Sequence, residues 1–295
     1  MSVELSILYR GTLSSCNYDC PYCPFAKHWE SPDELDSDRK GLERFIDWAT
    51  CHSERPLSVF FTPWGEALVR SWYRDAVVSL THLSHVRKVA VQTNLSCNLD
   101  WVGLAEAGKL GLWCTYHPGQ TSLGSFLKQC ERLSTSGVSY SVGCVGLREH
   151  FSEIDELRRR LPPTVYLWIN AFKSQEEYYD LSAIEQLTQI DPQFPVNNQR
   201  HPSRGKHCLT GETVVTVDSQ GNVRRCHFVD EVIGNLYDAN FEHSLRRRLC
   251  PNDTCGCHIG YVHLEHLDLQ SVYGAGILER VPQHVKSLPS NRSLA

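Results

Sequence analysis

The chain has 295 residues, enough for one large domain or for a domain of moderate size with a small appendage. Its formal charge of −5 and its pI near 6.3 give no general attraction for polyanions, so we expect neither a nucleic acid nor an acidic membrane surface as partner. The sequence shows no signal peptide and no apolar stretch of membrane-helix length. We therefore expect a cytoplasmic protein whose thirteen cysteines serve as metal ligands or thiols rather than disulfides.

Six short apolar runs, rich in β-branched and aromatic residues, predict strands. They are ELSILYR (4–10), LSVFF (57–61), VRKVAVQ (86–92), LGLWCTY (110–116), VSYSVGCV (138–145) and TVYLWIN (164–170). Apolar residues at helical spacing predict helices between some of these strands, within 42–49, 123–130 and 154–161. Such repeated βα units predict an α/β fold with a parallel sheet, either a partial barrel or an open, doubly wound sheet.

Three cysteines follow the first predicted strand in the stretch CNYDCPYC, as Cys16, Cys20 and Cys23. A tetrahedral zinc site would need a fourth ligand close by. Three thiolates on one loop can instead hold three corners of a cubane iron–sulfur cluster and leave the fourth iron open. The spacing C-x3-C-x2-C after a strand, with the aromatic Tyr22 before the last cysteine, resembles the radical S-adenosylmethionine superfamily.

This resemblance implies a partial (β/α)6 barrel that binds a catalytic [4Fe-4S] cluster and S-adenosylmethionine (AdoMet). AdoMet would chelate the open iron of the cluster through its own amine and carboxylate. Besides Tyr22, the resemblance implies contacts to AdoMet from Gly65 and Glu66, which follow the second strand at a Gly-Gly-Glu-like turn where Trp64 replaces the first glycine. Thr93 and Asn94 follow the third strand, where relatives often carry Thr-Asn-Gly, and Asn94 is the expected AdoMet contact. All these segments follow the carboxyl ends of strands, where parallel α/β folds build their sites.

The implied chemistry is reductive cleavage of AdoMet to a 5′-deoxyadenosyl radical, which abstracts hydrogen from a substrate. An electron donor such as a flavodoxin or a ferredoxin would supply the electron. His117 also follows a strand and could reach the pocket, although a turn histidine before Pro118 is the simpler interpretation.

The βα rhythm ends near residue 190, and DPQFPVNNQRHPSRGKHC predicts a linker with a domain boundary near Arg200. We thus predict a core domain in 1–200, an auxiliary cluster domain in 201–262, and a helix followed by a disordered tail in 263–295. In the second part, ETVVTVD and VRRC predict a β-hairpin, followed by a helix around 241–249. The last helix should return against the barrel.

A second group of cysteines lies in this small α+β part: Cys208, Cys226, Cys250, Cys255 and Cys257. Their arrangement resembles the twitch or SPASM extension of radical S-adenosylmethionine enzymes, and this implies one auxiliary [4Fe-4S] cluster with one cysteine to spare. A structural zinc site made from the same cysteines, helped by His207, His227 or His258, is the alternative. The other cysteines lie singly on apolar patterns and are expected to be buried thiols: Cys51, Cys97, Cys114, Cys130 and Cys144.

The resemblance leaves the substrate open. We expect modification of a ribosomally made peptide, because auxiliary-cluster extensions are frequent in that group, with recognition of the peptide supplied by a partner protein. The first alternative is an oxidoreductase that acts on a small metabolite and uses the auxiliary cluster as electron acceptor. The second is a non-catalytic binding module stapled by zinc.

Overall fold

A computed structural model describes residues 3–23, 25 and 29–286. One nine-stranded sheet forms its centre, with the strand order β11-β10-β9-β1-β2-β3-β4-β5-β6. The six predicted strands are confirmed as parallel neighbours: β1 (Leu5–Arg10), β2 (Leu57–Phe61), β3 (Val86–Thr93), β4 (Leu110–Thr115), β5 (Ser139–Val145) and β6 (Leu167–Asn170). The molecule is therefore an α/β protein with a mostly parallel central sheet. Its closure into a partial barrel stays a prediction.

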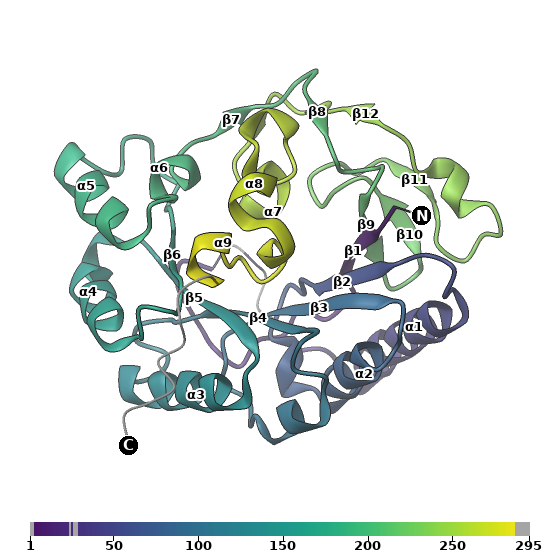
Figure 1. Cartoon of the computed structure of the whole chain (residues 1–295), viewed down its shortest axis with the longest axis horizontal. Coiled ribbons are helices and arrows are strands. Elements are labelled where there is room, and N and C mark those ends of the chain that lie inside the picture. Colours follow the sequence, from purple (N-terminus) through teal and green to yellow (C-terminus); the bar gives the residue numbers. More distant parts are fainter. Residues whose placement is uncertain (1–2, 24, 26–28, 287–295) are drawn as a thin grey trace.

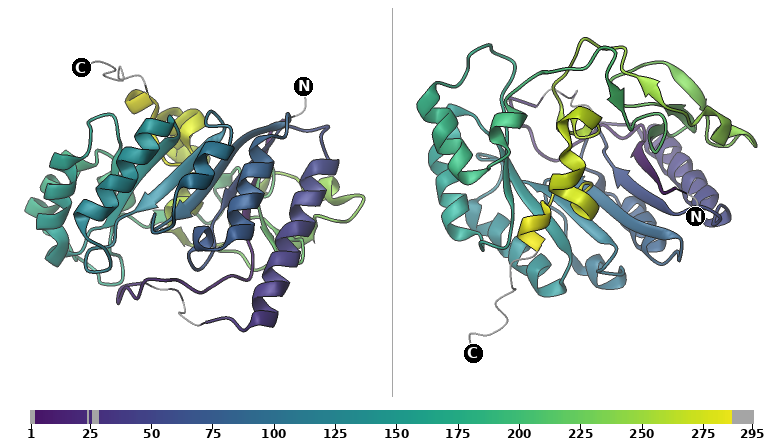
Figure 2. Two further views of the ribbon diagram at one scale, coloured as in Figure 1. Left: turned by 90° about the horizontal axis from the view of Figure 1, so that it is seen from below. Right: turned by 45° about the horizontal axis from the view of Figure 1, so that its top comes forward.

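Helices connect most of these strands and lie along one face of the sheet (Figures 1 and 2). They are α1 (Pro32–Cys51), α2 (Ser71–Thr81), α3 (Leu123–Ser136), α4 (Phe151–Arg160), α5 (Leu181–Ile190) and α6 (Phe194–Asn197). Helix α1 begins with a capping box, in which Ser31 and Glu34 each bond the other's backbone. Between β3 and β4, the connection holds a short 3₁₀ segment, η2 (Asp100–Leu104), and 3₁₀ turns precede α2 and α4 as η1 (Ala67–Val69) and η3 (Arg148–His150).

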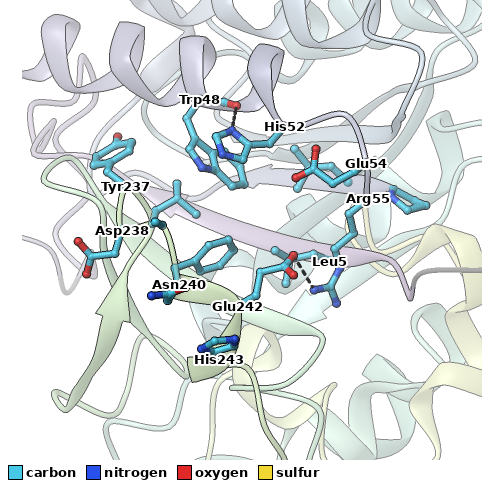
Figure 3. Close-up of a pocket in the computed structure, with 15 residues that line it drawn as sticks. Leu5, Trp48, His52, Glu54, Arg55, Tyr237, Asp238, Asn240, Glu242 and His243 are labelled. Carbon is cyan, nitrogen blue, oxygen red and sulfur yellow. Dashed lines mark hydrogen bonds and ion pairs between the residues drawn. The ribbon is translucent and has the colours of Figure 1, made fainter.

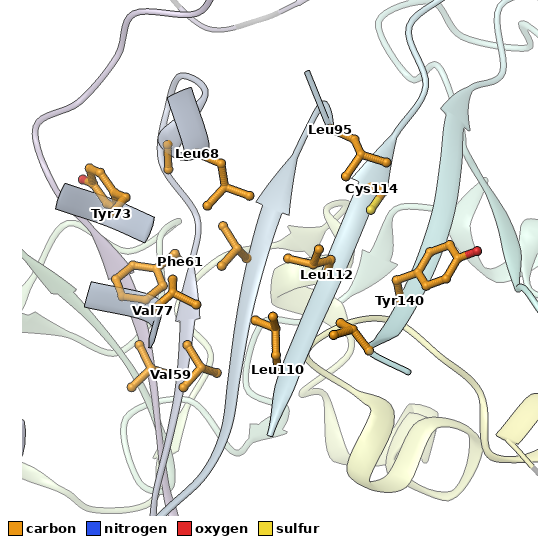
Figure 4. Packing of buried hydrophobic residues seen from close by; sticks show 14 of the residues in the cluster. Val59, Phe61, Leu68, Tyr73, Val77, Leu95, Leu110, Leu112, Cys114 and Tyr140 are labelled. Carbon is orange, nitrogen blue, oxygen red and sulfur yellow. The ribbon is translucent and has the colours of Figure 1, made fainter. Parts of the chain in front are cut away.

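Two hydrophobic clusters cover the two faces of the sheet. On the helix side, Val59 and Phe61 of β2 pack beside Tyr73 and Val77 of α2, and Leu112 of β4 lies farther along the same cluster (Figure 4). On the other face, Leu8, Phe60, Ala90, Trp113 and Trp168 pack against the end of the chain. Alternate residues of each strand thus serve different cores, as the two-residue period of a strand requires.

The end of the chain lies across the inner face of the sheet, where β1–β6 form an arc around it (Figure 1). This segment comprises α7 (His258–Tyr261), η5 (Glu265–Leu267), α8 (Leu269–Tyr273), η6 (Gly274–Gly276) and α9 (Gln283–Lys286). The predicted return of a helix against the sheet is confirmed as several short helices. The predicted disordered tail from residue 287 onward lies outside the described residues.

The predicted hairpin is also confirmed, as β9 (Val214–Asp218) and β10 (Asn222–Arg224). Strand β9 pairs in parallel with β1, and β11 (Val232–Asn235) follows β10, so this part of the chain extends the central sheet. The division into domains at residues 200 and 262 stays a prediction.

Two expectations are wrong, those for a helix at 241–249 and for Cys51. The segment predicted as a helix forms a 3₁₀ turn, η4 (Phe241–Ser244), and then β12 (Arg248–Leu249), which pairs with β8 (His207–Cys208). The segment predicted as a linker holds α6 and also β7 (His201–Pro202), which pairs with β13 (Thr254–Cys255), and its role as a domain boundary stays a prediction. Cys51 is exposed at the end of α1, whereas the other four single cysteines are buried. No helix among the described residues is long and apolar enough to cross a membrane.

Candidate functional site

The loop that follows β1 carries the first three cysteines. Cys20 is buried, and Cys16 and Cys23 are half-buried. The Glu30 carboxylate holds the start of this loop, because it accepts hydrogen bonds from the backbone N–H groups of Ser14 and Ser15, at 2.5 and 2.7 Å. Burial raises the pKa of Glu30, but these hydrogen bonds outweigh it and lower the pKa to about 2.

A cavity of about 170 Å³ opens between this loop and the carboxyl ends of β2, β3 and β4. All three cysteines line it, together with the predicted AdoMet contacts Gly65, Glu66 and Asn94 and with Trp64, Thr93 and His117. Four separate segments of the chain therefore bring the predicted residues to one place. Tyr22 lies beside this set and contacts His117 instead of the cavity.

Gly65 allows the turn after β2 to lie against the cysteine loop. A Cβ at this position would stand 1.8 Å from the carbonyl oxygen of Ser15. The neighbouring N–H of Glu66 donates to the same oxygen at 3.0 Å. The glycine is thus required by close backbone approach, because any side chain would push the two segments apart.

The side chain of Glu66 is 3% exposed and bonds the chain itself. Its oxygens accept from the Thr93 hydroxyl at 2.8 Å, from the Asn94 N–H at 2.5 Å and from the Leu68 N–H at 3.1 Å. Burial raises its pKa to about 7 against the lowering effect of these hydrogen bonds. The Glu66 side chain therefore positions the turn after β3.

Asn94 connects that turn to the cysteines. Its side-chain amide donates to Asn17 Oδ1 at 3.0 Å and lies 3.8 Å from the Cys16 sulfur. The N–H of Tyr18 donates to the same sulfur at 3.4 Å. Two hydrogen-bond donors therefore lie beside the Cys16 sulfur.

His117 belongs to the site, although the sequence favoured a turn histidine. Its Nδ1 lies 3.4 Å from the Cys20 sulfur and 3.0 Å from the Tyr22 hydroxyl, and its ring stacks on Tyr22. Burial, followed by the nearby His150, lowers the pKa of His117 to about 4, so the ring is neutral at pH 7. The signal that could have identified it is its position just after a strand, at the same edge of the sheet as the cysteines.

The second group of cysteines also gathers in space. Burial, followed by the thiols of Cys226, Cys257, Cys250 and Cys208, raises the pKa of Cys255 to about 12. Cys226 interacts in the same way with Cys208 and Cys250. Cys257 is exposed, and besides the pKa of Cys255 it raises the pKa values of Arg10, which ends β1, and of Lys173, which follows β6. All five cysteines therefore lie around one region, and Cys257 is also close to the ends of β1 and β6.

The donor chemistry fits the implied cofactors. Thiolates are the usual ligands of iron–sulfur clusters, and both groups offer them on short loops. Among the described residues, no three His, Cys, Asp or Glu side chains lie close enough together to hold a single metal ion.

A second cavity, of about 280 Å³, lies at the opposite edge of the sheet, where β1 and β2 begin (Figure 3). His52 and Arg55, near the end of α1, face Asp238 and Glu242 across it, and Arg55 and Glu242 form an ion pair at 3.6 Å. Its lining contains no cysteine among the described residues. The first three cysteines and the predicted AdoMet contacts Gly65, Glu66 and Asn94 line the cavity at the carboxyl ends of the strands instead.

No family model matches the chain, and no curated protein matches it in sequence. Solved structures share its fold. Native anSMEcpe with bound AdoMet has a TM-score of 0.52 and 15% sequence identity, over 81% of this chain and 82% of that one. A histidine-tagged form with bound AdoMet gives 0.51 and 14%, over 81% and 79%, and native anSMEcpe with AdoMet and the Cp18Cys peptide gives 0.50 and 15%, over 81% and 82%. At this identity, the similarity shows a common α/β fold.

Proposed function

We propose that the protein is a radical S-adenosylmethionine enzyme, in which Cys16, Cys20 and Cys23 hold a [4Fe-4S] cluster. One observation carries this proposal: the cavity that these cysteines line is also lined by Gly65, Glu66 and Asn94, the residues expected to bind AdoMet. The shared fold supports it, because anSMEcpe is a radical S-adenosylmethionine enzyme and binds AdoMet.

When bound, the cluster and AdoMet supply one-electron cleavage of the sulfonium and hydrogen abstraction from a substrate. Residues of the chain itself position the cysteines and the turns around this cavity. Asn94 and the Tyr18 N–H donate toward the Cys16 sulfur, and the close approach at Gly65 holds the turn after β2 against the cysteine loop. Phe25 and Trp64 stack edge to face at 4.8 Å on its rim, where they limit the entry of water.

Replacement of one cysteine tests this proposal. We expect Cys20→Ala to lose iron and sulfide after anaerobic reconstitution and to release no 5′-deoxyadenosine from AdoMet under a strong reductant. Cys51→Ala is the matched control, because Cys51 is exposed at the end of α1 and should leave both measurements at the parent level. Parent-level release of 5′-deoxyadenosine by Cys20→Ala would refute the assignment.

We further propose that the second group binds one auxiliary [4Fe-4S] cluster in a twitch-like extension, through Cys208, Cys226, Cys250 and Cys255. Interactions among these four thiols support this set, and we assign Cys257 as the spare cysteine because it is exposed and interacts with Cys255 alone among them. Cys255→Ser should then lose about half of the iron, and Cys257→Ser should keep all of it. Equal iron losses from the two variants would contradict the choice of Cys257 as the spare cysteine. Zinc without acid-labile sulfide would favour the structural zinc site instead.

For the substrate, we propose a ribosomally made peptide, with electrons from a flavodoxin or a ferredoxin. The peptide-bound structure of anSMEcpe and the exposed aromatic rings of Trp64 and Phe228 support this choice. Mass spectrometry of candidate peptides incubated with the reconstituted protein and AdoMet tests it. A mass change on a free metabolite, with none on any peptide, would favour the metabolite oxidoreductase instead.

A further inference from the structure

Arg10 is held at the edge of the cysteine cavity. It ends β1, and the two-residue period of that strand puts it on the inner face, like Leu8. Its Nε donates to the backbone oxygen of Thr62 at 2.7 Å. Its guanidinium lies 4.0 Å over the ring of Trp64, a residue that lines the cavity. Two contacts therefore fix the plane and the direction of this cation.

The terminal nitrogens of this fixed guanidinium have no acceptor among the described residues, and Arg10 takes part in none of their ion pairs. Burial lowers the pKa of Arg10 to about 10, and the Cys257 thiol is the one group that raises it. A half-buried cation without a counter-ion is unfavourable, and its remaining N–H donors are suited to two parallel bonds with an oxyanion.

The surroundings supply no carboxylate that could fill this role. Toward β2–β6, the inward-facing residues at the strand ends are uncharged: Thr62, Gln92, Thr115 and Asn170. On the other side, Asp218 ends β9 in register with Arg10, but its carboxylate is engaged by Arg224 at 2.9 Å and by Asn222 at 3.0 Å. The Glu66 carboxylate is already engaged by three donors from the chain. The ammonium of Lys173, which follows β6, is also engaged, because it donates to the backbone oxygens of Asn197 and Gly256. Arg10 is thus a fixed cation with open donors beside the cavity.

We propose that Arg10 binds an oxyanion of the substrate, a carboxylate or a phosphate, and so places the substrate beside the cysteine cavity. That this oxyanion belongs to a substrate rests on the function proposed above. The binding of an oxyanion at Arg10 can be measured without it. Arginine suits the role better than lysine, because its planar fork forms two bonds at once and its face remains stacked on Trp64.

The test measures the thermal stability of the reconstituted protein with AdoMet in malonate or in inorganic phosphate, with sodium chloride at equal ionic strength as reference. We expect one of the two anions to raise the Tm of the parent. Arg10→Gln should lose at least ten-fold in affinity for that anion, and Arg10→Lys should fall between the two. Arg44→Gln is the matched control, because Arg44 also stacks on an aromatic ring, that of Tyr237 at 3.7 Å, but lies on α1.

The outcomes separate the alternatives. Stabilisation by malonate alone identifies a carboxylate, and stabilisation by phosphate alone identifies a phosphate. Equal stabilisation of Arg10→Gln and the parent, or none of the parent, overturns the proposal. If Arg10→Gln does not fold, the comparison between Arg10→Lys and Arg44→Gln decides. Release of 5′-deoxyadenosine by the parent is measured separately, so its failure would refute the proposed enzyme and leave the anion site standing.

Discussion

Replacement of Gly65 by alanine tests the contact that joins the cysteine loop to the turn after β2. The added Cβ would start 1.8 Å from the Ser15 oxygen, and real Cβ atoms essentially never approach closer than 3.0 Å, so the segments must separate by about 1.2 Å. The hydrogen bond from the Glu66 N–H to Ser15 then breaks, which costs about 1 kcal/mol. Overpacking adds about 1–3 kcal/mol.

The sum of about 2–4 kcal/mol should lower the Tm by roughly 4–8 °C in a protein of this size. Thermal unfolding followed by circular dichroism measures this effect, and AdoMet binding by the same preparation should weaken. Gly103→Ala is the matched control, because a Cβ at Gly103 meets nothing within 4 Å. A Gly65→Ala protein that melts within about 1 °C of the parent and binds AdoMet equally well would refute the close approach.

Two carboxylates should give opposite dependences of stability on pH. The pKa of Glu66 is raised to about 7, so its contribution to the free energy of unfolding of the AdoMet-free chain is complete below about pH 4.5. This contribution, up to about 3 kcal/mol, is lost as the pH rises through 7. In Glu66→Gln, the free energy of unfolding measured with denaturant should therefore vary less between pH 5 and 8 than in the parent. The pKa of Glu30 is lowered to about 2, so its contribution is present above about pH 4.5 and is lost as the pH falls toward 2; Glu30→Gln should lose less stability than the parent between pH 5.5 and 3.5, and equal losses would contradict this. Lys88→Ala should cost about 3 kcal/mol in urea unfolding, because it removes the cation that lies 3.1 Å from the fully buried Glu279, whose same oxygen also accepts from the neutral Ser139 hydroxyl at 2.9 Å; a smaller loss for the Lys88→Met, Glu279→Met pair would confirm the reason.

The parallel strands could be predicted because each is a short apolar run whose residues are buried on both faces of the sheet, as β2 is throughout. The helix predicted for 241–249 was wrong, because the local pattern of apolar residues does not show which strands pair. Phe241, Leu245 and Leu249 recur at a spacing of four, which is helical. Leu249 instead pairs with His207 in a two-stranded sheet, a contact between distant segments that no local pattern reveals.

Contacts between distant segments also limited what could be predicted of the candidate site. The cysteine motif is local, so its position and its likeness to a cluster-binding loop could be recognised from the sequence. The role of the Glu66 side chain could not, because its partner Asn94 lies 28 residues away and the bond depends on how β2 and β3 pair. His117 was undervalued because its partners Cys20 and Tyr22 are almost a hundred residues distant.

The end of the chain limits where a substrate can lie. Arg280 is 1% exposed, and its guanidinium lies 4.5 Å from the ring of Trp168 and 5.4 Å from that of Trp113, in the middle of the inner face. Gly143 leaves room for this packing, because a Cβ there would overlap the Trp168 ring at 2.1 Å. Since these groups fill the inner face below the strand ends, open space remains at the carboxyl edge, beside the cysteine cavity and Arg10. If the protein has the function proposed above, a substrate would approach from that edge, where an anionic group on it would meet Arg10 beside the cavity.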